Sequence, residues 1–152
     1  QERFPNDEYE ITGSLEYFRG HQTAGELDIL VFRRDDGDCV LVGEAKFWRN
    51  LSAALKKAKA QLNRFKDHLY GGKISKYRWR PDPSRDFSDS QFLDNDCYEY
   101  FGPKGAEAAG FTQELNLSSP EGYWLLEQLR SHRSENFEEL WKVAGGKARL
   151  GS

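Results

Sequence analysis

Residues 25–47 carry the sequence GELDILVFRRDDGDCVLVGEAKF, and this stretch decides the fold. Residues 26–34 are rich in the β-branched and aromatic side chains that strands favour. Residues 39–47 have the same character, and the Asp-Gly pair within residues 35–38 is a strong signal for a tight hairpin turn. The stretch therefore predicts two antiparallel strands, residues 26–34 and residues 38–47, joined by a short turn.

Charged residues on this hairpin recur at a spacing of two, which places them on one face of each strand. Glu26 and Asp28 share a face of the first strand. Glu44 and Lys46 share a face of the second strand. The neighbouring side chains are aliphatic, and carboxylates in buried surroundings are costly unless they are paired or bind a metal. Because oxygen ligands on a rigid sheet favour Mg²⁺ or Mn²⁺ over zinc, these carboxylates are placed where such a metal could use them.

The rest of the chain predicts a mixed α/β fold. Apolar residues recur at steps of three and four over residues 51–70, which predicts a helix with Asn50 or Ser52 as its cap. We expect one domain over residues 1–152, with a central mixed sheet flanked by helices. The other expected elements are a helix or a strand over residues 9–19, a polar loop over residues 73–96, strands over residues 97–101 and 111–117, a helix that starts at Pro120 behind a Ser119 cap, and a last short helix with Phe137, Leu140 and Trp141.

The net charge of −3 hides a strong asymmetry along the chain. Residues 46–80 hold eleven Lys or Arg and one acidic residue, a net +10, whereas the remaining residues hold 11 basic and 24 acidic groups. A basic segment directly after the acidic motif suits a polyanion such as nucleic acid. Trp79 either stacks on an unpaired base or anchors its loop in the core, and the sequence leaves both roles open. The candidates for nucleic-acid binding are Lys56, Lys57, Arg64, Arg78, Trp79 and Arg80.

The motif Glu26-Leu27-Asp28, followed on the next strand by Glu44-Ala45-Lys46, resembles the core of the PD-(D/E)xK nuclease superfamily. The segment from Gln61 to Phe65 on the following helix resembles the Gln-x-x-x-Tyr motif of its RecB-like and lambda-exonuclease-like branch. Phe65 stands where that motif has tyrosine, which keeps the packing and loses the hydroxyl. The resemblance covers residues 25–65 and implies a restriction-endonuclease-like core.

The resemblance also implies roles for individual residues. Asp28, Glu44, Lys46 and Gln61 would form the catalytic centre. Asp28 and Glu44 would bind the metal together with the backbone carbonyl of Ala45. Members of the superfamily often complete the metal site with an upstream glutamate, for which Glu10 and Glu16 are the candidates here.

The implied activity is that of a Mg²⁺- or Mn²⁺-dependent nuclease, an endonuclease or an exonuclease, that hydrolyses phosphodiester bonds of nucleic acid, with DNA favoured over RNA. Two alternatives stay open. One is an inactive nuclease-fold module that binds nucleic acid or protein. The other is the nuclease toxin domain of a larger secreted protein, whose partner would be an inhibitor or immunity protein.

Composition disfavours several other classes of protein. No apolar run approaches the roughly 18 residues that a membrane-spanning helix needs. Cys39 and Cys97 form no CxxC pair and only three histidines are present, which disfavours a structural zinc site. We expect two buried or half-buried thiols, with a single disulfide as the alternative in an exported domain. No signal peptide is visible, and the lack of any Met leads us to expect a domain excised from a longer protein.

Overall fold

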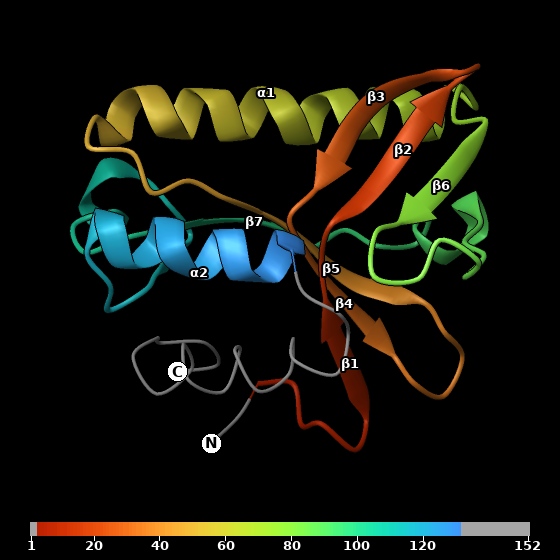
Figure 1. Ribbon diagram of the computed structural model, residues 1–152, viewed down its shortest axis with the longest axis horizontal. Helices are drawn as coiled ribbons and strands as arrows, with labels where there is room; N and C mark the ends of the chain where they lie inside the picture. The colour runs from red at the N-terminus through yellow and green to blue at the C-terminus, as the bar shows by residue number, and fades with distance from the viewer. Residues whose placement is uncertain (1–2, 132–152) are drawn as a thin grey trace.

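The computed structural model describes residues 3–131, with side chains through residue 127, and these residues form two sheets and two long helices (Figure 1). A five-stranded mixed sheet has the strand order β1-β4-β5-β7-β8, and a three-stranded antiparallel sheet has the order β3-β2-β6. This arrangement confirms the predicted mixed α/β class. The elements are β1 (Tyr9–Thr12), β2 (Leu15–Arg19), β3 (Gln22–Leu27), β4 (Ile29–Arg33), β5 (Cys39–Ala45), α1 (Leu51–Tyr70), β6 (Lys76–Trp79), the 3-10 turn η1 (Asp89–Gln91), β7 (Tyr98–Gly102), the 3-10 turn η2 (Glu107–Ala109), β8 (Gln113–Glu114) and α2 (Ser119–Ser131).

The predicted hairpin is present, but its first strand is divided between the two sheets. β3 ends at Leu27 and pairs with β2, whereas β4 begins at Ile29 and pairs with β1 and β5. Asp28 is the residue at which the chain passes from the three-stranded sheet into the five-stranded sheet. The prediction of one continuous strand over residues 26–34 was therefore wrong, and the division places Asp28 at the seam between the sheets.

The turn between β4 and β5 forms where the Asp-Gly pair predicts it. Gly37 has a φ of 77°, in the left-handed region that glycine adopts at little cost. Asp36 accepts a hydrogen bond from the backbone N–H of Asp38 at 2.9 Å, which tightens the turn. Beyond it, β5 returns antiparallel to β4, and Ile29 pairs with Gly43 near the far end of the hairpin.

Residues 9–19, which the sequence left open between a helix and a strand, form two strands. β1 lies at the edge of the five-stranded sheet, and β2 is the central strand of the three-stranded sheet. Ser14 has a φ of 58° at the point where the chain leaves β1 for β2. Between β1 and β4 the chain therefore changes sheets twice, first next to Ser14 and then at Asp28.

Helix α1 spans Leu51–Tyr70, as predicted, and lies with β6 and η1 in the crossover from β5 to the parallel strand β7. The Asn50 side chain accepts the backbone N–H of Ala53 at 3.0 Å, so Asn50 rather than Ser52 caps the helix. Gly71 ends the helix. The apolar stripe that predicted the helix is its buried face, formed by Ala54, Leu55, Ala58, Leu62, Phe65 and Leu69.

The segment 73–96, predicted as a polar loop, contains strand β6 and the turn η1. β6 pairs antiparallel with β2, and Tyr77 lies opposite Tyr17. Tyr77 and Trp79 face the core, while the charged residues between and beside them are exposed. The prediction of a loop was wrong at β6, where this alternation determines the local structure, and right for most of the residues that follow.

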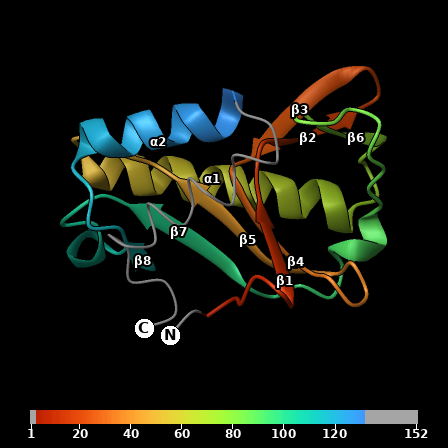
Figure 2. The ribbon, with the colours of Figure 1, turned by 60° about the horizontal axis from the view of Figure 1, so that its bottom comes forward.

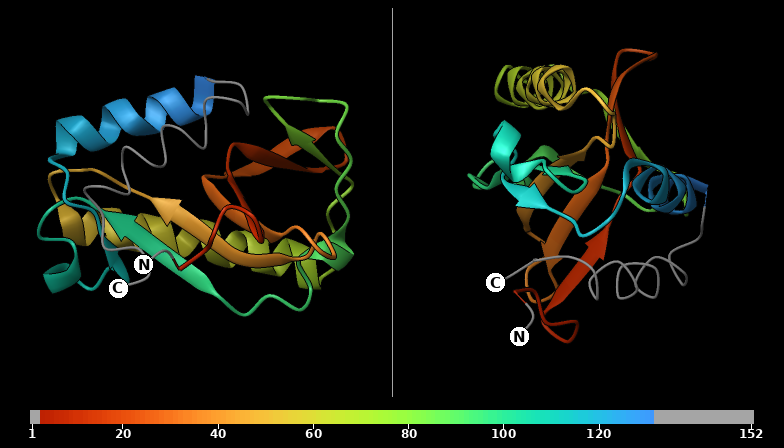
Figure 3. Two further views of the ribbon diagram at one scale, coloured as in Figure 1. Left: turned by 90° about the horizontal axis from the view of Figure 1, so that it is seen from below. Right: turned by 90° about the vertical axis from the view of Figure 1, so that its left-hand side faces the viewer.

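The two helices cover opposite faces of the five-stranded sheet (Figure 3, right panel). The face that carries Leu30 and Val42 packs under α1, together with the inner face of the three-stranded sheet. The face that carries Ile29 and Phe101 packs against Leu125 and Leu126 of α2. Figure 2 shows β1, β4 and β5 side by side between these layers. A charged side chain on β5 therefore lies beneath either α1 or α2.

The C-terminal part of the described chain follows the predictions with small shifts. β7 occupies Tyr98–Gly102, one residue beyond the expected range, and only Gln113–Glu114 of residues 111–117 form a strand. Ser118, not Ser119, caps α2, because its hydroxyl accepts the N–H of Glu121 at 3.3 Å. No helix in residues 3–131 is long and apolar enough to cross a membrane. The helix expected around Phe137, Leu140 and Trp141 lies outside the described residues.

Candidate active site

Asp28 and Glu44 lie side by side at the end of the β4–β5 ladder. The register pairs Ile29 with Gly43, so one step further along the ladder brings Asp28 opposite Glu44. The Asp28 carboxylate accepts the backbone N–H of Ala45 at 3.2 Å, which fixes it against this end of β5. Asp28 is 3% exposed and Glu44 is 1% exposed. Directly opposite residues have Cβ atoms about 4.5–5.5 Å apart, so both carboxylates can reach one small cation.

Lys46 lies two residues after Glu44, so both side chains project from the same face of the strand. Its backbone N–H donates to the carbonyl of Phe101 at 2.9 Å, so the pairing of β5 with β7 continues one residue beyond β5. The Lys46 side chain is buried, yet within residues 3–131 its ammonium forms no ion pair or hydrogen bond. Its Nζ atom lies 5.7 Å from the centre of the Trp48 ring. The three N–H donors of Lys46 are therefore not used by the described part of the protein.

Gln61 lies on the side of α1 that borders the buried face, at the middle of the helix. α1 packs on β5, and the end of β5 passes beneath the middle of α1 (Figure 1). The Gln61 Oε1 atom is buried and accepts no hydrogen bond from the described residues. A buried amide oxygen without such a bond is unusual in a folded protein. Gln61 thus lies on a helix that contacts β5, with a buried amide oxygen that the described residues leave unbonded, and its place in the catalytic centre stays a prediction.

Tyr17 packs beneath the same side of α1. Its ring contacts Phe65 edge-on with centroids 5.2 Å apart. Burial raises the pKa of Tyr17 to about 12, opposed by the nearby Arg64 charge and supported by the Glu44 charge. Tyr17 is therefore a neutral hydroxyl at ordinary pH. It was not singled out from the sequence, because residue 17 is far from the motif along the chain and only the pairing of β2 with β3 brings it there.

The chemistry of the donor set fits Mg²⁺ or Mn²⁺. Asp28 and Glu44 supply two carboxylates, and Mg²⁺ typically binds one or two carboxylates while keeping several waters. Within the described residues, no group of three or more His, Cys, Asp or Glu side chains is arranged to hold a metal ion. A metal at this site would therefore rest on Asp28, Glu44 and the Ala45 carbonyl, with other oxygens supplied by water and substrate.

The two upstream glutamates do not join the pair. Glu10 lies opposite Phe32, four residues along β4 from Asp28 and so roughly 13 Å away. Arg85 binds both carboxylate oxygens of Glu10, at 2.9 and 2.7 Å. Its strand position and its arginine partner therefore hold Glu10 away from Asp28, and the structure does not bring it together with the other predicted ligands.

Glu16 is also held by arginine. Arg78 forms an ion pair with it at 2.8 Å, and Arg80 lies 3.9 Å from the same oxygen. Arg80 also pairs with Glu26 at 3.1 Å, and Glu26 lies opposite Glu16 across the β2–β3 ladder. Metal binding by Glu16 would require its release from Arg78. Arg78 and Arg80, both predicted to bind nucleic acid, are half exposed. In the structure they form ion pairs with these glutamates.

The structure gives Trp79 the role of a core anchor. The side chain is 4% exposed, and its indole N–H donates to the Gly13 carbonyl at 2.9 Å and lies 3.1 Å from the Thr12 hydroxyl. A ring in this position has no face left for a nucleic-acid base. The prediction of Trp79 as a stacking platform was therefore wrong, and its alternative as an anchor is confirmed.

The exposed cations of α1 divide between two flanks of the helix. Lys57, Gln61 and Arg64 follow one another at steps of four and three residues, so they share one flank. This flank faces the three-stranded sheet, because Arg64 acts on Tyr17 of β2. Lys66 lies on the other flank, where its ammonium sits 4.1 Å from the ring centre of Tyr98. Lys56 is exposed and lies off the flank of Gln61.

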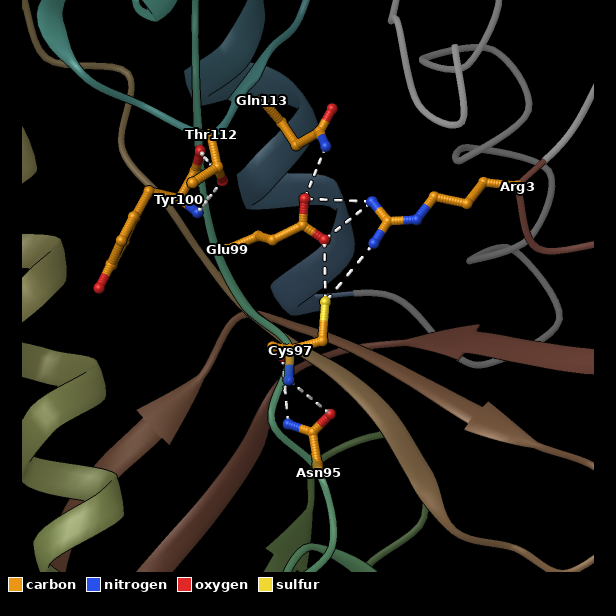
Figure 4. Close-up of polar contacts among 7 residues, drawn as sticks. All are labelled: Arg3, Asn95, Cys97, Glu99, Tyr100, Thr112 and Gln113. Atoms are coloured by element: carbon orange, nitrogen blue, oxygen red, sulfur yellow. Dashed lines mark hydrogen bonds and ion pairs between the residues drawn. The ribbon is translucent and has the colours of Figure 1, made fainter.

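A second polar cluster lies on the α2 face of the same sheet (Figure 4). Glu99 is 8% exposed, and its carboxylate pairs with Arg3 at 2.8 Å. The Gln113 amide donates to it at 2.6 Å, and the Cys97 thiol donates to it at 3.3 Å. Burial and the Glu99 carboxylate raise the pKa of Cys97 to about 11, so the thiol is protonated and unreactive at neutral pH. The Glu99 carboxylate therefore has three donors within the described residues.

Both cysteines are free, with Cys39 buried and Cys97 half buried, as the sequence predicted. Burial raises the pKa of Cys39 to about 12. The alternative of a disulfide between them is wrong.

Comparisons of the chain with models of protein families, with curated proteins and with solved structures give no match in any of the three.

Proposed function

We propose that the chain is a nuclease that depends on Mg²⁺ or Mn²⁺ and hydrolyses phosphodiester bonds, with DNA favoured over RNA. One observation carries the proposal: two carboxylates and an ammonium, each less than 10% exposed, are gathered at one end of β5 beneath α1. Buried charges destabilise a fold unless they are compensated, so they persist where they serve a function. The fold that we propose for this arrangement is the restriction-endonuclease-like core of the PD-(D/E)xK superfamily.

The proposed division of roles follows from the donor atoms. Asp28 and Glu44 would hold the metal, whose contribution in such sites is to polarise the phosphate and to activate water. Asp28 is held ready by the Ala45 N–H, so the ligand needs little reorganisation. Lys46 would donate its N–H groups to an oxygen of the scissile phosphate and stabilise the charge that develops there.

The basic flank of α1 supports the same proposal. Lys57 and Arg64 are exposed next to Gln61, on the side of the helix that borders the site. Contacts of this kind bind the phosphate backbone without regard to sequence and set the register of the substrate.

The decisive experiment incubates the purified chain with labelled single-stranded and double-stranded DNA and RNA, in Mg²⁺, in Mn²⁺ and in EDTA. We expect cleavage that needs the metal and stops in EDTA. Cleavage that continues in chelator would rule out the metal-dependent mechanism. A lack of cleavage of all four substrates in both metals, with tight binding to one of them, would instead identify the inactive binding module.

Matched variants separate the site from the rest of the sheet. Asp28→Asn should lower the cleavage rate by about 100-fold or more, since even residues that only support a metal ligand contribute 10–100-fold. Glu10→Gln is the control, because it also removes one carboxylate charge from this sheet but lies outside the site. Equal rates in the two variants would remove Asp28 from the proposed centre.

A further inference from the structure

The Lys46 ammonium is held in an unusual way. A buried lysine normally pairs with a carboxylate, and two carboxylates lie on the same strand end. Within the described residues Lys46 nevertheless pairs with neither, and the contact of its Nζ is the face of the Trp48 indole ring at 5.7 Å. This distance lies inside the roughly 6 Å over which a ring attracts a cation, and indole is the strongest of the aromatic side chains in this respect.

The Trp48 ring is itself immobilised. It is half buried and packs against a separate small core that joins the first turns of α1 to the segment after β7, formed by Ala54, Leu55, Ala106 and Phe111. Two residues later, Asn50 caps α1 and fixes the connection from β5 to the helix. A ring that packs against a buried cluster in this way has less freedom than an exposed surface group.

We propose that Trp48 is a positioning residue for Lys46, an inference that rests on the nuclease function proposed above. The indole face holds the ammonium beside Glu44 through its quadrupole, which uses none of the strong acceptors of the site. The N–H donors therefore stay directed at an incoming phosphate oxygen. An ion pair with Asp28 or Glu44 would instead spend those donors and compete with the metal for the carboxylate.

Two substitutions separate the ring face from its bulk. Trp48→Phe keeps an aromatic face, and Trp48→Leu keeps apolar packing but removes the face. We expect Trp48→Leu to lower kcat roughly tenfold while KM changes little, because the contact orients a group that acts in the transition state. Trp48→Phe should recover most of the loss. Trp124→Leu, at an exposed tryptophan of α2, is the control and should cleave at the parental rate.

A double-mutant cycle with Lys46→Ala tests whether Trp48 acts through Lys46. In the Lys46→Ala background, Trp48→Leu should cause no further loss of kcat, because the group that it positions is already absent. A merely structural role would lower kcat by the same factor in both backgrounds. Equal factors, or a parental kcat in Trp48→Leu alone, would overturn the inference while leaving the nuclease proposal intact.

A readout that needs no activity is the NMR signal of the Lys46 side chain in protein labelled with ¹³C-lysine. The ε-methylene protons above an indole ring should be shifted upfield, and the signal is assigned by its absence in Lys46→Arg. The shift should collapse in Trp48→Leu and persist in part in Trp48→Phe. An unshifted signal in the parental protein would refute the contact, whether or not the protein cleaves nucleic acid.

Discussion

Glu44 and Glu99 occupy adjacent rows of the neighbouring strands β5 and β7, yet they serve opposite faces of the sheet. Gly43 pairs with Glu99, and Glu44 pairs with Tyr100. On the α2 face, Glu99 is surrounded by Arg3, Gln113 and Cys97, which all donate to it. On the α1 face, Glu44 lies between Asp28 and Lys46. The described residues do not use the N–H donors of the Lys46 ammonium.

The difference teaches how to distinguish a structural buried charge from a functional one. Glu99 sits in a network that gives its carboxylate three donors, which is what a stabilising network requires. The α1 face has two neighbouring carboxylates, which repel each other, and an ammonium over a ring whose N–H donors the described residues do not use. Removing a charge from the Glu99 network on the α2 face should lower stability. Removing a charge from the α1 face should lower activity.

The largest effect is expected at Lys46. Lys46→Ala should lower kcat by roughly 10²–10³-fold, as is typical when one donor to a developing oxyanion is removed. Calorimetry should find Mn²⁺ binding nearly unchanged, because the lysine is no ligand. Lys66→Ala, whose ammonium also lies over a ring, is the control. A parental rate in Lys46→Ala would mean that the α1 face has no such donor.

The second prediction tests the α2 face. Glu99→Gln should lower the free energy of unfolding by about 1–3 kcal/mol, because a carboxylate with three donors becomes a neutral amide that cannot accept them equally well. The midpoint of urea unfolding gives the change, and the rate of nucleic-acid cleavage should stay parental. A stability equal to that of the parental protein would show that the network contributes little.

The third prediction concerns the basic flank next to the site. Replacing Lys57 and Arg64 together with Ala should weaken binding across all sequences and flatten its salt dependence, by about 0.9 in the log–log slope per lost contact on duplex and 0.7 on single strands. The thermal midpoint should barely move, since exposed charges add little stability. Replacing Lys56 and Lys59, which lie off this flank, should change the slope less. Equal slopes in the two double variants would mean that the flank has no special role.

The smallest effect is a pH dependence on the α2 face. The pKa of Cys97 is raised to about 11 in the fold, from an ordinary value near 9. Between these two values the unfolded thiol loses its proton while the folded thiol keeps it, so stability falls as pH rises through this window. Cys97→Ala should therefore lose less stability than the parental protein between pH 9 and pH 11, measured by urea unfolding. Parallel curves would exclude this contribution.

Local sequence predicted the elements whose signals are local. Helix α1 was predicted from end to end because its apolar spacing and both of its caps lie within the segment itself. The turn at Gly37 was predicted for the same reason. The hairpin predicted that Asp28 and Glu44 lie on neighbouring strands, but their exact pairing depends on a register shift between Val31 and Phe32 that the turn does not predict.

The features that were missed depend on contacts between distant parts of the chain. The change of sheet at Asp28 leaves no local trace, because a strand that passes between sheets has the same alternation as one that stays. Strand β6 carries alternating charged and aromatic residues, but the prolines that follow it suggested a loop. The pair of Arg3 with Glu99 spans 96 positions, and only the folded sheet brings it together.

The most direct test of the central claim compares Glu44→Gln with Glu99→Gln, since both replace one buried glutamate by its amide on adjacent rows of the same sheet. The measurement is the initial rate of cleavage of labelled DNA in Mn²⁺, with EDTA as the blank. We expect Glu44→Gln to lose cleavage by about 100-fold or more while remaining folded, and Glu99→Gln to cleave at the parental rate. Parental cleavage by Glu44→Gln, or an equal loss in both variants, would contradict a catalytic centre on the α1 face.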